Sequence, residues 1–69
     1  MSNDEAIAQI IGITQKSKES IIEIVEKYSI SAEIIYKFYC ALARFPTYEE
    51  ADFIAICGVD NFVKIYFNN

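Results

Sequence analysis

The chain of 69 residues can build one small hydrophobic core but not two, so we expect a single domain over residues 1–69. Ten acidic and six basic side chains give a net charge of −4, which disfavours nucleic acid as the main partner, since phosphate binding normally needs a basic surface. Hydrophobic residues make up 54% of the chain, which indicates a dense core with some apolar surface left uncovered.

Two short helices are predicted first. Asn3 or Asp4 can cap a helix whose apolar residues recur at the i, i+3, i+4 spacing of one helical face, and Gly12 weakens its end. A second helix is predicted over about residues 18–28, after Ser17, because apolar residues recur there every three to four positions. The β-branched residues of this segment also suit a strand, which is the alternative structure for it.

The longest predicted helix lies at the centre of the chain. Ser31 can cap it, and Pro46 stops it at or before Phe45, because the residue before a proline is pushed out of the helical region. Apolar residues at helical spacing form its inward face: Ile35, Phe38, Tyr39, Leu42 and Phe45. Few charged positions are left on its surface, which indicates a helix that other helices nearly surround.

Two further helices are predicted in the last third of the chain. Thr47 and Glu50 match the capping box, in which each side chain accepts a hydrogen bond from the backbone of the other residue. The helix that starts there runs to Gly58, which suits the left-handed conformation of a helix end or a tight turn. Asp60 can cap a last helix with an apolar stripe of its own. The predicted fold is therefore an all-α, compact bundle of about five short helices.

Residues 25–39 resemble the helix-turn-helix signature. Ser29 takes the place of the small residue that opens the turn, Ile30 is the aliphatic residue after it, and Ser31 is the polar cap. Ile35 lies six positions after Ser29, where the family has an aliphatic residue that packs the second helix. The resemblance implies a helix-turn-helix-like corner, whose second helix enters the major groove of DNA in members of that family.

A helix-turn-helix DNA-binding transcriptional regulator is the alternative function that this resemblance implies. Its nucleic-acid contacts would be Lys37 and Arg44, in the second helix of the corner. The outward positions of that helix are Ala32, Glu33, Tyr36, Lys37 and Cys40. Bases are usually read by Arg, Lys, Asn or Gln, so these positions specify groove contact poorly. We therefore interpret Lys37 and Arg44 first as a solvated polar strip.

A partner-binding patch is predicted at the start of the fourth helix. It consists of Tyr48, Glu49, Glu50 and Asp52. A tyrosine brings a large rigid contact area with a polar tip, and the carboxylates would attract a basic surface of another protein. Acidic residues in the first turn of a helix also stabilise the helix dipole, which is the structural alternative for the same cluster.

Catalysis is not expected from this composition. Histidine is absent from the chain, and with it the commonest general base and the commonest metal ligand. Gly12 and Gly58 are isolated, so the chain has no glycine-rich loop for phosphate, and no cofactor or metal is predicted. Cys40 and Cys57 are expected to be small buried hydrophobic residues with reduced thiols.

The predicted function is a non-catalytic protein-binding module, a small regulator or inhibitor of the kind that phages and other mobile elements encode. Its partner would offer a basic or apolar surface, a homodimer is a further alternative, and nucleic acid is the less favoured partner. The N-terminus is acidic where a secretory signal is basic, and no apolar run approaches the ~20 residues of a membrane span. We therefore expect a soluble cytoplasmic protein that does not enter membranes.

Overall fold

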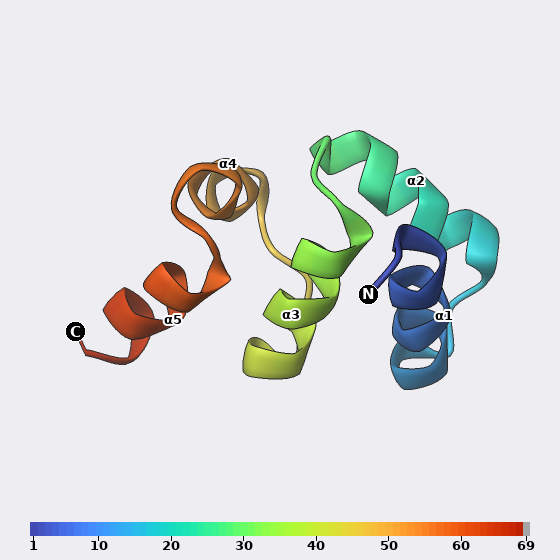
Figure 1. Cartoon of the computed structure of the whole chain (residues 1–69), viewed down its shortest axis with the longest axis horizontal. Helices are drawn as coiled ribbons and strands as arrows, with labels where there is room; N and C mark the ends of the chain where they lie inside the picture. The colour runs from blue at the N-terminus through green and yellow to red at the C-terminus, as the bar shows by residue number, and fades with distance from the viewer. Residues whose placement is uncertain (69) are drawn as a thin grey trace.

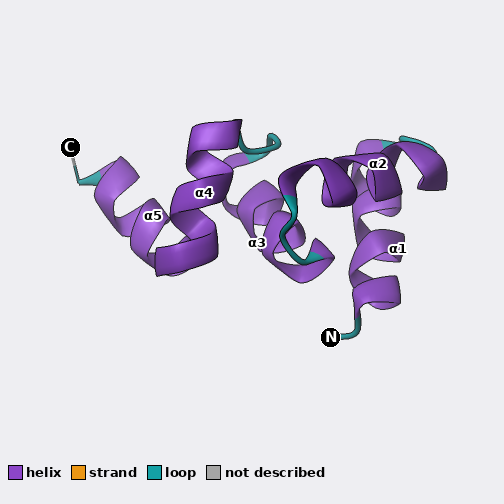
Figure 2. Ribbon diagram, turned by 90° about the horizontal axis from the view of Figure 1, so that it is seen from above, coloured by secondary structure: helices purple, strands orange, loops and turns teal. Residues whose placement is uncertain are grey.

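The computed structural model describes residues 1–68, which fold into helices joined by short turns (Figure 1). In chain order the helices are α1 (Asn3–Thr14), α2 (Lys18–Tyr28), α3 (Ala32–Leu42), α4 (Tyr48–Cys57) and α5 (Val59–Phe67). No strand occurs in this part of the chain (Figure 2). The predicted all-α bundle is therefore confirmed, and the strand alternative for residues 18–28 is wrong.

The bundle is elongated, with Cα extents of 34 × 20 × 20 Å. The helix α3 lies in the middle, where α1 packs on one side of it and α5 on the other (Figure 1). The helix α2 packs against α1 and α4, and α4 packs against α5. Within residues 1–68, no helix combines the length and the apolar character that crossing a membrane requires.

The core consists of side chains that all five helices direct inward. Its largest fully buried members are Phe38, Ile10, Ile21, Ile35, Ile54 and Pro46. Only part of the predicted inward face of α3 is deeply buried, since Tyr39, Leu42 and Phe45 are half-buried. Full burial of an isoleucine or phenylalanine side chain stabilises the fold by about 1.5–3 kcal/mol.

The predicted N-caps Ser31 and Thr47 are confirmed, and Ser17, after which the second helix was predicted, is a third N-cap. The Oγ atoms of Ser17 and Ser31 accept hydrogen bonds from backbone amides three residues further on, and these bonds start α2 and α3. Thr47 and Glu50 form the complete capping box at the start of α4. Each cap satisfies one of the backbone N–H groups that a helix start leaves without a partner.

The first helix is capped by Ser2, so the prediction of Asn3 or Asp4 as its cap is wrong. The side chain of Asn3 has another role. Its Oδ1 accepts a hydrogen bond of 3.0 Å from the backbone N–H of Ala32, at the start of α3. A contact between residues that are 29 positions apart cannot be read from local spacing, whereas a serine cap one position earlier satisfies the same local rule.

The helix-turn-helix-like corner is present between α2 and α3. Ser29 adopts a left-handed conformation with φ 55°, and its N–H closes the end of α2 by bonding the carbonyl oxygen of Val25. Ile30 is buried, and Ser31 caps α3. A left-handed residue at the turn is the conformation for which glycine is best suited, and here a serine adopts it.

The central helix ends at Leu42, three residues before the predicted limit at Phe45. Ala43 adopts a left-handed conformation with φ 57°, and its N–H donates to the carbonyl oxygen of Tyr39 at 2.7 Å. This bond ends the helix at Leu42, so the helix stops before the position at which Pro46 would have stopped it. Phe45 therefore lies in the turn, where its ring packs 5.2 Å from the ring of Tyr39.

A single residue, Gly58, separates α4 from α5. Its φ of 87° is positive, but its ψ of 159° lies far from the left-handed helical region that the sequence predicted. This combination is open almost only to glycine. The helix α5 then starts directly at Val59, without a side-chain cap, so the prediction that Asp60 caps it is wrong.

Both cysteine thiols are free and exposed, so the prediction that Cys40 and Cys57 are buried is wrong. Cys40 lies five positions after the buried Ile35 on α3, and Cys57 is the last residue of α4. An offset of five positions on a helix is about 140° of rotation, which turns Cys40 away from the face that packs the core.

Candidate functional site

The four residues predicted as a partner-binding patch lie in the first turns of α4 but do not form one surface. Tyr48 faces α2, and Glu49 and Glu50 face α5. Asp52 is exposed. The structure therefore divides the predicted patch into two directions, because successive residues of a helix are about 100° apart around its axis.

The exposed ring of Tyr48 connects α4 to α2. It meets the ring of Tyr28 edge to face at a centroid distance of 5.1 Å, and the Nζ of Lys27 lies 5.2 Å from its centroid. Such contacts are favourable by about 0.5–1.5 kcal/mol for the ring pair and about 0.5–1 kcal/mol for an exposed cation over a ring. Tyr48 is 55% exposed, so contacts within the fold cover the rest of its surface.

The carboxylate of Glu50 is held by Arg44. The guanidinium donates two hydrogen bonds, at 2.8 and 2.9 Å, and the backbone N–H of Thr47 donates a third at 2.9 Å. These bonds lower the pKa of Glu50 to about 2 and raise the pKa of Arg44 further above its ordinary value. A carboxylate with both oxygens occupied in this way acts within the fold, and its charge is largely neutralised for a partner.

The same ion pair changes the interpretation of Arg44. Its guanidinium also donates to the carbonyl oxygen of Phe45 at 3.2 Å and lies 5.3 Å from the centre of the buried Phe38 ring. Arg44 is therefore only partly in solvent, with 41% of its side chain exposed, and its guanidinium is engaged within the fold. Lys37 fits the prediction of a solvated strip, since its side chain is 60% exposed and its Nζ lies 3.7 Å from the carboxylate of Glu33.

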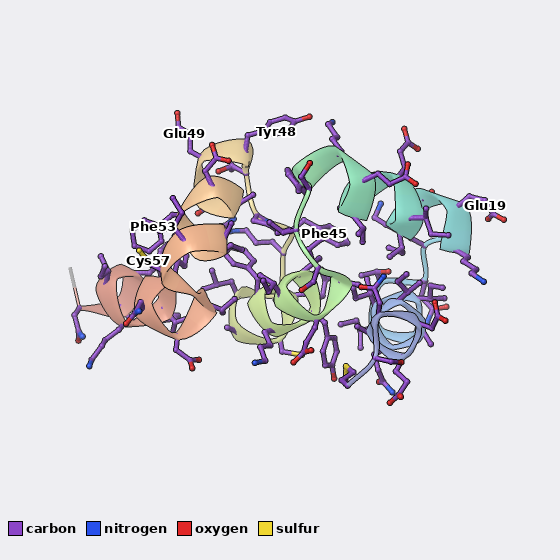
Figure 3. The ribbon with its side chains drawn as sticks, turned by 45° about the horizontal axis from the view of Figure 1, so that its top comes forward. Glu19, Phe45, Tyr48, Glu49, Phe53 and Cys57 are labelled. Carbon is purple, nitrogen blue, oxygen red and sulfur yellow. The ribbon has the colours of Figure 1, made fainter. Side chains whose placement is uncertain are left out.

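An open cavity of about 380 Å³ lies between α4 and α5. Its lining residues are Glu49, Glu50, Phe53, Phe62, Ile65 and Tyr66. The rings of Phe53 and Phe62 meet edge to face at 5.9 Å, and Tyr66 stacks on Phe62 at 5.8 Å. Glu49 and Phe53 lie on the same side of α4, one turn apart (Figure 3). The cavity therefore has an aromatic wall with a carboxylate at its edge.

The outer surface of α4 beside this cavity carries both charge and apolar area. Glu49, Asp52, Phe53 and Ile56 are spaced at i, i+3, i+4, i+7, which places them on one side of the helix. Ile56 is 86% exposed, and Ile65 of α5 is 52% exposed. We define the α4–α5 face by these residues: Glu49, Asp52, Phe53, Ile56, Phe62, Ile65 and Tyr66.

Exposed apolar side chains gather at this end of the bundle. Seven large hydrophobic side chains are exposed among residues 1–68, and five of them belong to α4 or α5. These five are Tyr48, Ile56, Ile65, Tyr66 and Phe67. Tyr48 faces α2, whereas Ile65 and Tyr66 line the open cavity, and exposed apolar residues beside a cavity are typical of an interaction site.

Sequence reasoning located the carboxylates of this face but missed the contribution of α5. One signal in the sequence could have found it. Ile65 lies outside the apolar stripe that Phe62 and Tyr66 continue, so it widens the apolar surface of α5 beyond the width that packing in a bundle needs. An apolar side chain on a second side of the last helix indicates apolar surface that the other helices do not cover.

The face of α3 that the corner would offer to DNA is only partly exposed, since Lys37 and Cys40 are exposed while Glu33 and Tyr36 are half-buried. Ala32, one of its predicted outward positions, is completely buried. A second cavity, of about 470 Å³, lies between α3 and α5 and is lined by Tyr36, Lys37, Cys40, Ala41, Val59, Asp60 and Val63. Asp60 thus brings a carboxylate to the cavity that Lys37 lines, which weakens any positive potential there.

The described residues offer no set of metal ligands. No group of three or more histidine, cysteine, aspartate or glutamate side chains within residues 1–68 is placed to hold a metal ion. Both cavities are lined mainly by apolar and aromatic side chains. The two cavities can therefore bind apolar groups, and their few charged side chains can set the orientation of what binds.

Comparisons of the chain with protein-family models, with curated proteins and with solved structures found no match in any of the three. A small helical bundle is compatible with many activities, so the fold alone does not indicate a function. Among the described residues we take the α4–α5 face as the candidate site, because it combines an open cavity and carboxylates with the exposed large side chains of Ile56, Ile65 and Tyr66.

Proposed function

We propose that this chain is a non-catalytic protein-binding module, a small regulator or inhibitor, that contacts its partner through the α4–α5 face. The observation that carries the proposal is the open cavity between α4 and α5 with exposed apolar side chains around it. Contiguous exposed apolar surface with a polar border is characteristic of protein contact sites.

The residues of the face have the character of binding anchors. Tyr66 and Ile65 stand about half exposed beside the cavity, and Phe53 and Phe62 form its wall. Most of the binding energy in a protein interface comes from a few residues in well-packed pockets, and aromatic residues are enriched among them. A cavity of about 380 Å³ has room for a large side chain of a partner.

The charge of the face favours a basic partner. Glu49 and Asp52 are exposed, and neither forms an ion pair with a lysine or arginine within residues 1–68. The net charge of −4 adds a long-range attraction for cationic surfaces. Complementary charge at an interface mainly speeds encounter and selects among partners, while the apolar contacts supply affinity.

A site-specific photocrosslinker tests this proposal. Benzoylphenylalanine replaces Tyr66 in one sample and Glu23 of α2 in the other, and each protein is irradiated in an extract of the cells that produce it. We expect a discrete adduct from position 66 that excess unlabelled protein displaces, and none from position 23. Equal adducts from both positions, or no displaceable adduct, would contradict the proposal.

A helix-turn-helix DNA-binding regulator is the second candidate function. It is favoured by the corner between α2 and α3, where Ser29 has the positive φ that the turn needs. It is disfavoured by the ion pair of Arg44 with Glu50, which leaves Lys37 as the one predicted phosphate contact without a bidentate carboxylate partner in the described part of the chain.

A further inference from the structure

The residues of the α4–α5 face indicate which class of partner it binds, an inference that rests on the proposed function. We infer that the face binds a basic amphipathic helix of another protein. In this inference an apolar side chain of that helix enters the cavity beside Phe53 and Phe62, and its lysine or arginine residues lie over Glu49 and Asp52.

The geometry of the face favours a helical occupant. The part of the chain that the structure describes has no strand, and so no sheet edge to which an extended peptide could add. The cavity is lined on α4 by Glu49, Glu50 and Phe53, and the face continues along this helix to Ile56, seven positions or about 10 Å beyond Glu49. A helix laid along a face of that length presents apolar anchors at i, i+3, i+4 and i+7, as in other helix-in-groove complexes.

The charge of the face requires basic groups in that occupant. Glu49 and Asp52 are separated by three positions, so both carboxylates lie along the same side of α4 as Ile56. A helix with one apolar stripe and flanking cations would therefore bury its stripe against Phe53 and Ile65 while its cations meet the carboxylates. An acidic helix of the same shape would place like charges together, which opposes binding.

A second copy of this chain does not fit these requirements. No described helix carries more basic than acidic side chains. In a two-fold dimer through the α4–α5 face, Glu49 and Asp52 would meet only residues of the same face, which contains no lysine or arginine. The occupant is therefore assigned to a different protein.

The chain offers an internal control for simple charge attraction. The helix α2 carries three exposed glutamates, Glu19, Glu23 and Glu26, and Glu23 lies in the middle of the helix. None of the three lines the α4–α5 cavity or the cavity between α3 and α5. A ligand that responds to charge alone should approach both surfaces, whereas a ligand that needs charge with an apolar groove should select the α4–α5 face.

The test is a titration of the full chain, labelled with ¹⁵N, with synthetic helical peptides of about 14 residues followed by NMR. One peptide combines leucine and lysine, a second replaces leucine with serine, and a third replaces lysine with glutamate. We expect the leucine–lysine peptide to shift the amides of Phe53, Ile56 and Ile65 saturably. The serine–lysine peptide should bind at least about tenfold more weakly, and the leucine–glutamate peptide should not bind.

Matched charge reversals complete the test. Glu49→Lys and Glu23→Lys change the net charge equally, so we expect the first to weaken leucine–lysine binding by about three- to tenfold and the second to leave it nearly unchanged. The milder Glu49→Gln should weaken it less, and circular dichroism checks that all variants fold. Equal effects of the two reversals, shifts centred on α2, or saturable shifts caused by self-association without peptide would overturn the inference.

The outcomes also separate this inference from the proposed function. If a displaceable photocrosslink forms from position 66 but the leucine–lysine peptide fails to bind, the partner class is wrong and the binding function stands. If neither experiment gives binding at the α4–α5 face, both fail.

Discussion

Arg44 and Glu50 form a bidentate ion pair, with hydrogen bonds of 2.8 and 2.9 Å between the guanidinium and the two carboxylate oxygens. Arg44 follows the end of α3, and Glu50 lies in the first turn of α4, so the pair spans the turn between these helices. The same carboxylate accepts the backbone N–H of Thr47. One side chain thus completes the capping box of α4 and fixes the path of the chain into it.

This ion pair predicts a loss of stability in acid. The folded pKa of Glu50 is about 2, below its ordinary value of 4.5. The contribution of the pair is therefore complete above about pH 5 and is lost as the pH falls toward 2. Because the Arg44 side chain is 41% exposed, solvent screening reduces the effect, and we expect about 1–2 kcal/mol. Urea unfolding followed by circular dichroism at a series of pH values measures it.

Removing the charge of Glu50 checks the assignment. Glu50→Gln should lower the free energy of unfolding by about 1–2 kcal/mol at pH 7 and make the acid limb of the stability profile shallower. Glu49→Gln is the matched control, because Glu49 is exposed and forms no ion pair within residues 1–68. An acid limb that is equally steep in wild type and Glu50→Gln would show that other carboxylates cause it.

The two glycines of the chain should respond in opposite directions to the same substitution. Gly58→Ala places a side chain at φ 87° and ψ 159°, where a residue with Cβ is strained by about 1–3 kcal/mol. Gly12→Ala lies within α1, where alanine is favoured by about 0.5–1 kcal/mol. Neither new Cβ meets an atom within 4 Å, so packing does not obscure the comparison.

Thermal or urea unfolding of both glycine variants measures this difference. A stable Gly58→Ala variant would mean that the junction between α4 and α5 can take another conformation without cost. Light scattering should accompany the measurement, because a straightened junction would release α5 and allow two copies to exchange it.

The starts of α3 and α4 were predictable from sequence because a cap is a local device: Ser31 and Thr47 act on backbone groups within one turn, so their spacing contains the information. The caps predicted for α1 and α5 were wrong. The Arg44–Glu50 pair was not predictable in the same way. It joins two helices across a turn whose path depends on the left-handed conformation of Ala43, and an alanine gives no signal for that conformation.

The candidate site shows the same division between local and long-range information. The carboxylates of α4 could be found, because Glu49 and Asp52 follow an evident helix start. The cavity depends on the contact of Phe53 with Phe62, which is set by the bend at Gly58. The sequence indicates that a bend occurs at this glycine but not its angle, so which residues of α5 border the cavity could not be derived.

The left-handed alanine at the end of α3 predicts a stabilising substitution. Ala43 has φ 57°, a conformation that costs a residue with a Cβ atom about 1–2 kcal/mol. Glycine has no Cβ atom and avoids this cost. Ala43→Gly should therefore raise the free energy of unfolding by about 0.5–1 kcal/mol, even though glycine also increases the entropy of the unfolded chain. Urea unfolding at pH 7 checks the sign.

Ala41→Gly is the matched control for this substitution. Ala41 is also exposed on α3 but lies inside the helix, so glycine there should lower stability by about 0.5–1 kcal/mol. Opposite signs for the two variants would support the left-handed helix end. Destabilisation by both would indicate that α3 continues through Ala43 toward Pro46.

The hydrogen bond between Asn3 and Ala32 predicts a local effect on amide exchange. Asn3→Ala removes the acceptor of the Ala32 N–H and should lower stability by about 0.5–1.5 kcal/mol. The Ala32 amide should then exchange with solvent faster than its neighbours in α3 do. Ser2→Ala removes the cap of α1 instead, so it should lower overall stability without a selective effect on Ala32. Equal exchange at Ala32 in both variants would argue against the bond.

The charge distribution predicts that the corner between α2 and α3 does not bind DNA. Arg44 is held by Glu50, Lys37 lies 3.7 Å from Glu33, and the net charge is −4, so few counterions would be released from phosphate. We expect no change in the fluorescence anisotropy of a labelled duplex of about 20 base pairs at micromolar protein and about 50 mM salt, since even nonspecific binders are detected under such conditions. Lys37→Glu should match wild type, and Glu33→Gln, which frees Lys37, should add little. Binding that weakens with salt and disappears in Lys37→Glu would instead establish the corner as a DNA contact.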